Sequence, residues 1–285
     1  MVDKKTWFIT GCDKGMGHAF AGVLLAQGER VVVTARDVAN VRPLLEQHPG
    51  TAFGYTLDIT HPAQIREVVD EAERATGGID VVVNNAGYGL LGPAEATTPE
   101  EYRPMFEVNF FGMAEVTRAF LPHMRRRRRG HIINTSSSGG FAASPGFAFY
   151  AATKFAVEGF SESVALDVAA LGIKVTILEP GSFRTDFAGG SLAKPAADIE
   201  DYSMTAVKST IDRMTARHGT QPNDPRRLAK VLILLSRMDN PPLRIPLGLD
   251  AIERLRQKLD SVRAEFDKYE DLSLAVAFDS AVDLD

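Results

Sequence analysis

The chain has 285 residues, of which 45% are hydrophobic and 24% are charged, and its formal net charge is −5. This is the composition of an ordinary globular protein, and it excludes the disordered and fibrous classes. The mild acidity argues against a general nucleic-acid-binding or membrane-surface role, because such roles usually bring a basic excess.

Short apolar runs alternate with longer amphipathic stretches along most of the chain. The runs are rich in β-branched residues, as buried parallel strands are, and they cover 7–10, 31–34, 53–57, 81–83, 132–135 and 175–178. The stretches between them repeat apolar residues every three or four positions, which predicts helices. This alternation predicts one α/β domain over 1–285, with a doubly wound, mostly parallel sheet and helices on both faces.

Two later regions depart from this alternation. Residues 182–222 are rich in Gly, Ser, Ala and Pro and are too long for a plain connection, so we expect a substrate lid there. Residues 248–270 predict a C-terminal helix after a short edge strand at 243–245. Its apolar seam consists of Ile252, Leu255, Leu259, Val262, Phe266 and Tyr269. The seam spans only about three heptads, which favours a helix packed on its own domain over a dimeric coiled coil.

The other notable residues do not indicate a nucleic-acid, metal or membrane site. Arg125 to Arg129 form the strongest charge run, and we prefer the solvated C-terminal end of a helix to a nucleic-acid patch. The histidines lack metal-ligand spacing, so no metal is expected. Cys12 is the only cysteine, and neither a signal-peptide core nor an apolar stretch of about 20 residues is present. We therefore expect a cytoplasmic protein with no membrane or nucleic-acid partner.

The stretch ITGCDKGMG at 9–17 follows the first apolar run and precedes an amphipathic stretch. Gly11, Gly15 and Gly17 permit a tight turn whose backbone N–H groups approach phosphate oxygens at a helix start. The spacing is G-x-x-x-G-x-G, so the commoner G-x-G-x-x-G fingerprint is absent. Arg36 ends the second run where an NAD-binding unit would place an acidic residue. It either holds a 2′-phosphate or is an exposed charge at a strand end.

Tyr150 and Lys154 are four residues apart and share one face if their segment is helical. Tyrosine has a pKa near 10, and bringing it near 7 requires roughly 4 kcal/mol of differential stabilisation. A neighbouring ammonium and an oxidised nicotinamide would contribute to this, and a serine at a preceding strand end would orient a substrate oxygen. The pair alone also occurs by chance on many helices.

Together these motifs are a more specific signal than any one of them alone. T-G-x-x-x-G-x-G at 10–17, N-N-A-G at 84–87, a serine thirteen positions before Tyr150, Y-x-x-x-K at 150–154 and P-G-x-x-x-T at 180–185 occur in this order. In these motifs, over about residues 5–190, the chain resembles the short-chain dehydrogenase/reductase family, and within it members related to hydroxysteroid and retinol dehydrogenases. The resemblance implies a Rossmann-type sheet of seven strands in the order 3-2-1-4-5-6-7. It also implies homodimers or homotetramers formed through the two long helices beside the site.

The resemblance also implies roles for individual residues. Tyr150 would be the general acid/base, Lys154 would lower its pKa and bind the nicotinamide ribose, and Asn109 would support a proton-relay water. Ser137 would orient the substrate oxygen, and its spacing favours it over Ser136 and Ser138. Residues implied to bind the cofactor are Gly11, Asp13, Lys14, Gly15, Met16, Gly17, Arg36, Asp58, Ile59, Asn85, Ala86, Gly87, Tyr150, Lys154, Pro180, Gly181, Phe183 and Thr185.

The cofactor choice depends on three charged residues. In the family, basic residues at the positions of Lys14 and Arg36 accompany NADP, and two cations on one phosphate form charge-assisted hydrogen bonds. Asp13 acts in the opposite direction, because a carboxylate would repel a 2′-phosphate or accept from ribose hydroxyls. It would alternatively pair with Lys14 or cap the following helix. We favour NADP over NAD.

The expected function is an NADP-dependent ketoreductase that interconverts a hydrophobic ketone or aldehyde and the alcohol. A set of large apolar residues would form its pocket, or would serve core and lid packing: Phe141, Phe147, Phe149, Phe183, Phe187 and Met204. One alternative is an NAD-dependent alcohol or hydroxysteroid-type dehydrogenase. Another, from a different class, is a non-catalytic dinucleotide-binding regulator.

Overall fold

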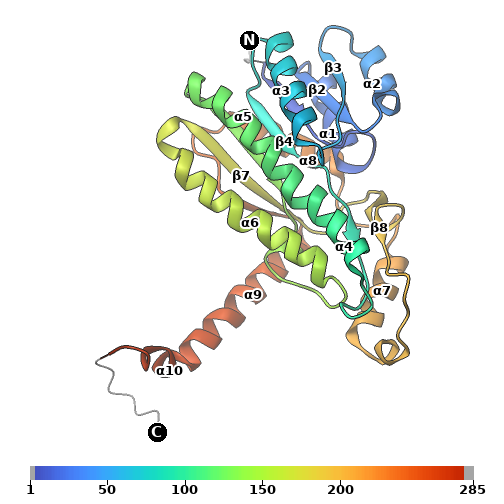
Figure 1. The fold of residues 1–285 in the computed structure, drawn as a ribbon, viewed down its shortest axis with the longest axis vertical. Helices are drawn as coiled ribbons and strands as arrows, with labels where there is room; N and C mark the ends of the chain where they lie inside the picture. Colours follow the sequence, from blue (N-terminus) through green and yellow to red (C-terminus); the bar gives the residue numbers. More distant parts are fainter. Residues whose placement is uncertain (1–3, 279–285) are drawn as a thin grey trace.

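The computed structural model describes residues 4–278. A seven-stranded parallel sheet, in the order β3-β2-β1-β4-β6-β7-β9, forms the centre of the fold (Figure 1). Its strands are β1 (Thr6–Ile9), β2 (Arg30–Ala35), β3 (Ala52–Thr56), β4 (Val81–Asn84), β6 (Gly130–Thr135), β7 (Ile173–Pro180) and β9 (Arg244–Leu247). The predicted Rossmann-type class and strand order are confirmed.

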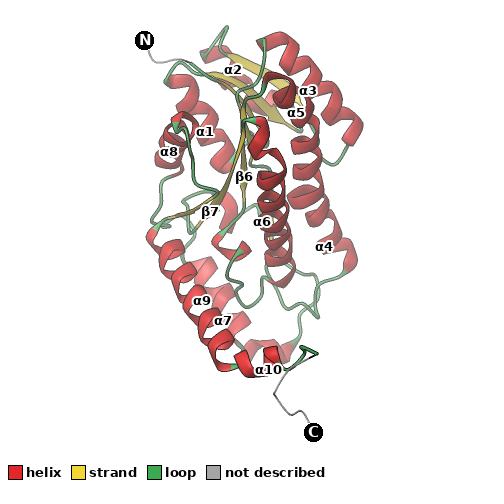
Figure 2. Ribbon diagram, turned by 90° about the vertical axis from the view of Figure 1, so that its left-hand side faces the viewer, coloured by secondary structure: helices red, strands yellow, loops and turns green. Residues whose placement is uncertain are grey.

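Helices cover both faces of this sheet (Figure 2). The α-helices are α1 (Gly15–Ala26), α2 (Arg42–Gln47), α3 (Pro62–Thr76), α4 (Pro99–Phe106), α5 (Met113–Arg127), α6 (Ala148–Val168), α7 (Ala206–Ala216), α8 (Pro225–Arg237), α9 (Leu249–Lys268) and α10 (Glu270–Leu274). A π-helical turn (Glu107–Gly112) joins α4 to α5. The 3₁₀ turns are Val38–Val41, Ser138–Gly140, Ala169–Leu171, Asp186–Ala188 and Glu200–Met204.

Alternate residues of each strand supply two separate hydrophobic cores. Trp7 and Ile9 of β1 face α1 and α8, whereas Phe8 between them faces α3, α5 and α6. Phe8 and Phe120 of α5 meet edge to face, with their ring centres 4.8 Å apart. Because both faces are buried, the strands are apolar throughout, and this is why they could be located in the sequence.

The segment expected to form a lid contains α7, two 3₁₀ turns and one short strand. Within it, β8 (Leu192–Ala193) pairs in parallel with β5 (Gly89–Leu90), which follows β4. Its two ends meet, because Arg184 N donates to Asn223 O at 2.8 Å and Asn223 Nδ2 donates to Ser182 O at 2.9 Å. The excursion therefore leaves the sheet after β7 and returns to the same point before α8.

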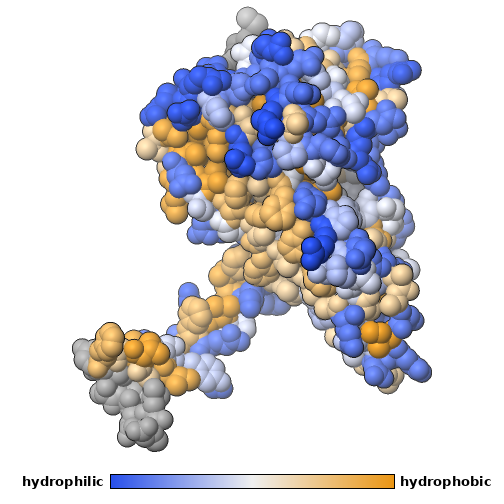
Figure 3. Space-filling view, in the orientation of Figure 1, coloured by the Kyte–Doolittle hydropathy of each residue, from blue (hydrophilic) through white to orange (hydrophobic). Residues whose placement is uncertain are grey.

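The C-terminal helix α9 differs from the expectation that it packs on its own domain. Ala251 and Leu255 are buried, but Leu259 is 55% exposed and Phe266 is 72% exposed. Beyond its first turns α9 extends away from the body, and apolar side chains are exposed along it (Figures 1 and 3). The prediction that this helix packs on its own domain therefore holds for its first turns and not for the rest of the seam, because a periodic seam does not reveal whether a neighbouring surface reaches it.

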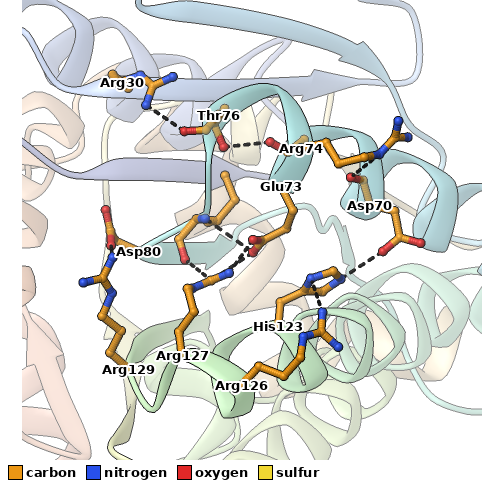
Figure 4. A network of polar contacts seen from close by, with 12 residues as sticks. Arg30, Asp70, Glu73, Arg74, Thr76, Asp80, His123, Arg126, Arg127 and Arg129 are labelled. Carbon is orange, nitrogen blue, oxygen red and sulfur yellow. Dashed lines mark hydrogen bonds and ion pairs between the residues drawn. The ribbon is translucent and has the colours of Figure 1, made fainter.

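The arginine run ends α5, as expected, but it is not uniformly solvated. Arg127 Nη2 donates to Glu73 Oε1 of α3 at 3.0 Å and to Ile79 O at 2.8 Å, and Glu73 is buried (Figure 4). Arg128 adopts a left-handed conformation with φ of 55° and ends the helix. One of the five arginines thus joins α5 to α3 and to the loop before β4. His131, in β6, also lies buried.

Within residues 4–278, no helix combines the length and the apolarity needed to cross a membrane.

Candidate active site

A cleft of about 1320 Å³ opens at the carboxyl ends of the parallel strands. The loops after β1, β4, β6 and β7 form its walls, together with the end of β2 and the 182–222 segment. This position contains the point between β1 and β4 at which the strand order reverses, where doubly wound folds bind ligands. All but two of the residues expected to act in catalysis or to bind the cofactor line the cleft, and the two exceptions are Gly17 and Asn109.

The glycines of the first loop permit close backbone packing. Gly11 has a φ of +70°, and a Cβ there would lie 3.0 Å from Ala86 Cα. Gly17 is buried behind the loop, and a Cβ there would lie 2.2 Å from Gly11 O and 2.5 Å from Asn85 Nδ2. Gly17 therefore shapes the loop from behind. Thr10 ties this loop to the loop after β4, since its Oγ1 accepts hydrogen bonds from Asn85 N at 2.9 Å and from Ala86 N at 3.0 Å.

The start of α1 faces the cleft without a side-chain cap. Its first N–H groups have no partner within the helix, and the helix dipole favours an anion at this end. The glycine loop and the uncapped helix start together fit the diphosphate of a dinucleotide. Asp13 caps nothing here, and within residues 4–278 it forms no ion pair with Lys14. Neither structural explanation for Asp13 is therefore supported, and its side chain lines the cleft.

Lys14 and Arg36 are exposed cations at one end of the cleft. Asp58 and Tyr88 line the cleft within the electrostatic range of Arg36. Burial alone would raise the pKa of the Asp58 carboxyl, but hydrogen bonds from Thr60 and the nearby charges of His61 and Arg36 lower it below its usual value. Asp58 is thus an anion at neutral pH, and its Oδ1 accepts from Thr60 N at 2.9 Å.

Tyr150 and Lys154 lie on α6 and line the cleft together, as their spacing predicted. Lys154 Nζ lies 5.9 Å from the centre of the Tyr150 ring and donates to Thr135 O at 2.8 Å. Ser137 follows Ser136 just after the end of β6, and its hydroxyl lies close enough to Tyr150 to act on the pKa of the phenol. Its Oγ also accepts from Gly139 N at 3.0 Å. Ser136 and Ser138 are buried, whereas Ser137 is partly exposed to the cleft.

Burial controls the titration of both α6 groups. It raises the pKa of Tyr150 to about 12, although the hydrogen bond with Ser137 acts to lower it. Burial also lowers the pKa of Lys154 to about 8, against the effect of Glu158, which raises it. Burial thus opposes a lowered pKa of Tyr150 in the chain by itself, and the role expected of Lys154, which also involves an oxidised nicotinamide, stays a prediction. At neutral pH Tyr150 is a neutral phenol, which is a proton donor, and Lys154 is mostly an ammonium.

Asn109 lies in the π-helical turn and is buried. Its Oδ1 accepts from Tyr88 N at 3.0 Å, and its Nδ2 donates to Tyr88 O at 2.9 Å and to Thr153 Oγ1 at 3.1 Å. The side chain is thus occupied in fixing the loop after β4 against α6. Asn109 does not line the cleft, and the support of a proton-relay water that was expected of it stays a prediction.

The expected apolar pocket is only partly formed. Phe147, Phe183 and Phe187 line the cleft, and the rings of Phe147 and Phe187 each lie 5.7 Å from the Tyr150 ring, centre to centre. Three other residues expected in the pocket do not line it: Phe141, Phe149 and Met204. Phe149 stacks on Tyr102 with ring centres 4.1 Å apart, and Met204 is 92% exposed. Sequence position alone could not separate these residues, because all are apolar and lie in or near the same loops.

Sequence reasoning also missed several cleft residues. The residues Arg213 of α7, Arg217 directly after α7 and Arg254 of α9 line the cleft. The available signal was the four-residue spacing of Arg213 and Arg217, but such spacing is equally typical of a solvated helix face. Their approach to the cleft depends on how the 182–222 segment and α9 fold back to the sheet.

The fold and the site define a dinucleotide-binding α/β oxidoreductase, and comparison with known proteins agrees. The family model described as short chain dehydrogenase matches residues 5–196. The chain therefore belongs to the short chain dehydrogenase family, which consists of oxidoreductases.

Several relatives resemble nearly the whole chain. "Oxidoreductase BOA17" of Botryotinia fuckeliana is 36% identical, over 96% of this chain and 99% of its own. The 3-ketodihydrosphingosine reductase of Bacteroides thetaiotaomicron is 36% identical over 84% of this chain and 86% of its own. Human retinol dehydrogenase 8 is 34% identical over 84% and 80%.

Solved structures give the same picture. A short-chain dehydrogenase from Streptomyces avermitilis superposes with a TM-score of 0.90, at 38% identity, over 97% of this chain and 100% of its own. ElxO with NADP bound superposes with a TM-score of 0.69, at 27% identity, over 84% and 93%. Members of this family thus bind NADP in the fold that this chain adopts.

Proposed function

We propose that this protein is an NADP-dependent oxidoreductase that interconverts a ketone or aldehyde carrying a hydrophobic part and the corresponding alcohol. The observation that carries the proposal is the convergence of Tyr150, Lys154 and Ser137 on one wall of the cleft. Two aromatic side chains beside Tyr150, Phe147 and Phe187, support a partly apolar substrate. The relatives that are named for a sphinganine-type ketone and for retinol act on such compounds.

The chemistry that the nicotinamide cofactor supplies when bound is hydride transfer. In the direction of reduction, the Tyr150 hydroxyl donates its proton to the substrate oxygen, which suits a phenol that is neutral at pH 7. The Ser137 hydroxyl orients that oxygen. The Lys154 ammonium stabilises the phenolate left behind and would hold the nicotinamide ribose.

The cofactor would lie along the wall that holds the first loop. The residues proposed to hold it are Gly11, Asp13, Lys14, Gly15, Met16, Arg36, Asp58, Ile59, Asn85, Ala86, Gly87, Pro180, Gly181, Phe183 and Thr185, which line the cleft. Lys14 and Arg36 favour a 2′-phosphate because both are cations without an ion-pair partner in the described part of the chain. Asp13, on the same wall, is the residue that would favour NAD.

The decisive experiment is Tyr150→Phe. We expect carbonyl reduction with NADPH to fall by at least about a thousandfold, because the proton donor is lost. The affinity for NADPH, measured by fluorescence titration, should change less than about threefold, since the phenol ring remains. Tyr102→Phe is the matched control, because Tyr102 stacks on Phe149 outside the cleft. Retained turnover in Tyr150→Phe refutes the assignment.

Two alternatives make different predictions in the same measurements. An NAD-dependent alcohol dehydrogenase would bind NADH at least as tightly as NADPH. A non-catalytic dinucleotide-binding regulator would bind either cofactor but turn over no member of a carbonyl panel. The presence of Tyr150, Lys154 and Ser137 together favours the enzyme.

We further propose that residues 182–222 act as a substrate lid, because Phe187 and Arg213 of this segment line the cleft while both ends are tied together. Limited proteolysis within this segment should slow when NADP and a product alcohol are added.

A homodimer or homotetramer would cover Phe111, Phe155 and Leu166, which are exposed on the surface of the π-turn and α6. Light scattering tests this assembly. A cytoplasmic location, expected from the single cysteine, stays a prediction that cell fractionation tests.

A further inference from the structure

Three arginines that line the cleft are not among the residues assigned to the cofactor. One face of α7 and of the residue that follows it lines the cleft with Thr210, Arg213, Met214 and Arg217. On α9, Asp250, Arg254 and Gln257 do the same. In Figure 1 these two helices lie below the sheet, whereas α1 lies near its top. The guanidinium groups are therefore distinct from Lys14 and Arg36.

Arg254 is held rigidly in a half-buried position. Its Nη2 donates to Ser144 Oγ at 2.6 Å and to Ala142 O, both in the loop that leads to Tyr150. Arg213 Nη2 donates to Thr210 Oγ1 at 3.2 Å, one turn back on its own helix. A guanidinium has five N–H donors, so each of these side chains keeps several for a ligand.

No carboxylate neutralises this group within residues 4–278: Arg213, Arg217 and Arg254 form no ion pair there. Asp250 is the acidic residue that acts on Arg254, but its Oδ2 accepts from Ser182 N at 2.7 Å and its Oδ1 from Asn223 Nδ2 at 3.2 Å. Asp186 also lines the cleft, and its Oδ2 accepts from Gly190 N at 3.1 Å.

The cations also act on one another. Burial and the nearby charge of Arg213 lower the pKa of Arg254 below its usual range. Holding two guanidinium groups together in a partly desolvated cleft is unfavourable unless an anion comes between them. Planar guanidinium groups match the geometry of carboxylate and phosphate oxygens.

We propose that the substrate carries an anionic oxygen group, a carboxylate or a phosphate, which binds between Arg213 and Arg254. The inference rests on the proposed function and narrows its substrate class to an amphiphilic carbonyl compound. The apolar part contacts Phe147 and Phe187 beside Tyr150. The anionic end is anchored by arginines from the segment proposed as a lid and from α9. Arg217 lines the cleft one turn after Arg213 and adds positive potential.

Calorimetric titration of the full chain with three probes of equal chain length tests this inference. The probes are octanoate, octyl phosphate and octanamide, none of which undergoes hydride transfer. Saturating NADP is present so that Lys14 and Arg36 are occupied. We expect at least one anionic probe to bind about tenfold or more tightly than the neutral amide. A preference for octanoate identifies a carboxylate substrate, and a preference for octyl phosphate identifies a phosphate.

Variants locate the anion. Arg213→Met should weaken the binding of the anionic probe by about tenfold and leave the affinity for octanamide unchanged. This variant keeps the fold, because Arg213 bonds only within α7. Arg254→Met should act likewise, and Arg254→Lys should restore part of the loss. Arg256→Met is the matched control, since Arg256 is exposed on the same helix and does not line the cleft.

Equal binding of the three probes, or unchanged anion affinity in Arg213→Met, overturns the inference. These outcomes are independent of turnover. If no carbonyl compound is reduced, the proposed function fails while the anion measurement still stands.

Discussion

Glu179 precedes Pro180 at the end of β7, and its side chain is only 1% exposed. Its nearest cation is Arg244, whose Nε lies 3.9 Å from Oε1, and that oxygen has no hydrogen-bond partner in the described residues. Burial and the charge of Glu158 raise the pKa of Glu179 to about 7, although Arg244 acts to lower it. The free energy of unfolding should therefore depend on pH through this one residue.

The sign and the size follow from proton linkage. In the unfolded chain Glu179 loses its proton near pH 4.5, whereas in the folded chain it keeps the proton until about pH 7. Folding therefore takes up a proton in this window. The stabilisation is complete below pH 4.5 and is lost as the pH rises to about 7. At about 1.4 kcal/mol per pH unit, the loss is on the order of 3 kcal/mol.

Glu179→Gln removes this dependence, because the amide does not titrate. Urea unfolding across the pH range, followed by the fluorescence of Trp7, the single tryptophan, measures it. We expect the difference in unfolding free energy between Glu179→Gln and the unaltered chain to grow in the variant's favour by about 3 kcal/mol from the acidic to the neutral end.

Glu162→Gln is the control for the loss of an Arg244 partner. Glu162 Oε2 accepts from Arg244 Nη2 at 2.6 Å, but its side chain is 51% exposed. Its substitution should give no comparable pH slope, because water screens an exposed pair. A constant difference between Glu179→Gln and the unaltered chain at every pH would refute the reasoning.

Three further substitutions test the cofactor wall and the fold. Arg36→Leu should weaken NADPH binding by about tenfold and NADH binding by less than about twofold, as measured by fluorescence titration; equal losses would contradict a 2′-phosphate contact. Gly17→Ala places a Cβ 2.2 Å from Gly11 O. It should therefore lower both the melting temperature and the affinity for either cofactor. Unchanged values would show that the loop shifts to accommodate the Cβ without a measurable cost. Arg127→Met leaves Glu73 buried and unpaired, and should cost about 3 kcal/mol of unfolding free energy. A loss below about 1 kcal/mol in urea unfolding would mean that water reaches Glu73.

Part of the site could be predicted because it depends on local helix geometry and on the pattern of the strands. Tyr150 and Lys154 share a face because α-helical geometry brings residues four apart together, whatever surrounds the helix. Gly11 and Arg36 follow apolar strands, and parallel strands end at one edge of a sheet, so their meeting in one cleft follows from the strand pattern.

Properties that depend on burial were not predictable in this way. The sequence places Lys154 near Tyr150, but the burial that raises the pKa of Tyr150 and lowers that of Lys154 depends on the whole cleft wall. Asn109 shows the same limit, because its partners Tyr88 and Thr153 lie on other elements.

The sequence by itself determined the fold class, the strand order through family resemblance, and the positions of Gly11, Ser137, Tyr150 and Lys154 at the strand ends and on α6. Only the tertiary structure decided that Met204 faces outward, that α9 leaves the body after Leu255, and that arginines of α7 and α9 enter one cleft. The physical reason is the range of the interactions. Hydrophobic periodicity and helical spacing act over a few residues, whereas burial and electrostatic potential depend on segments brought together from distant parts of the chain.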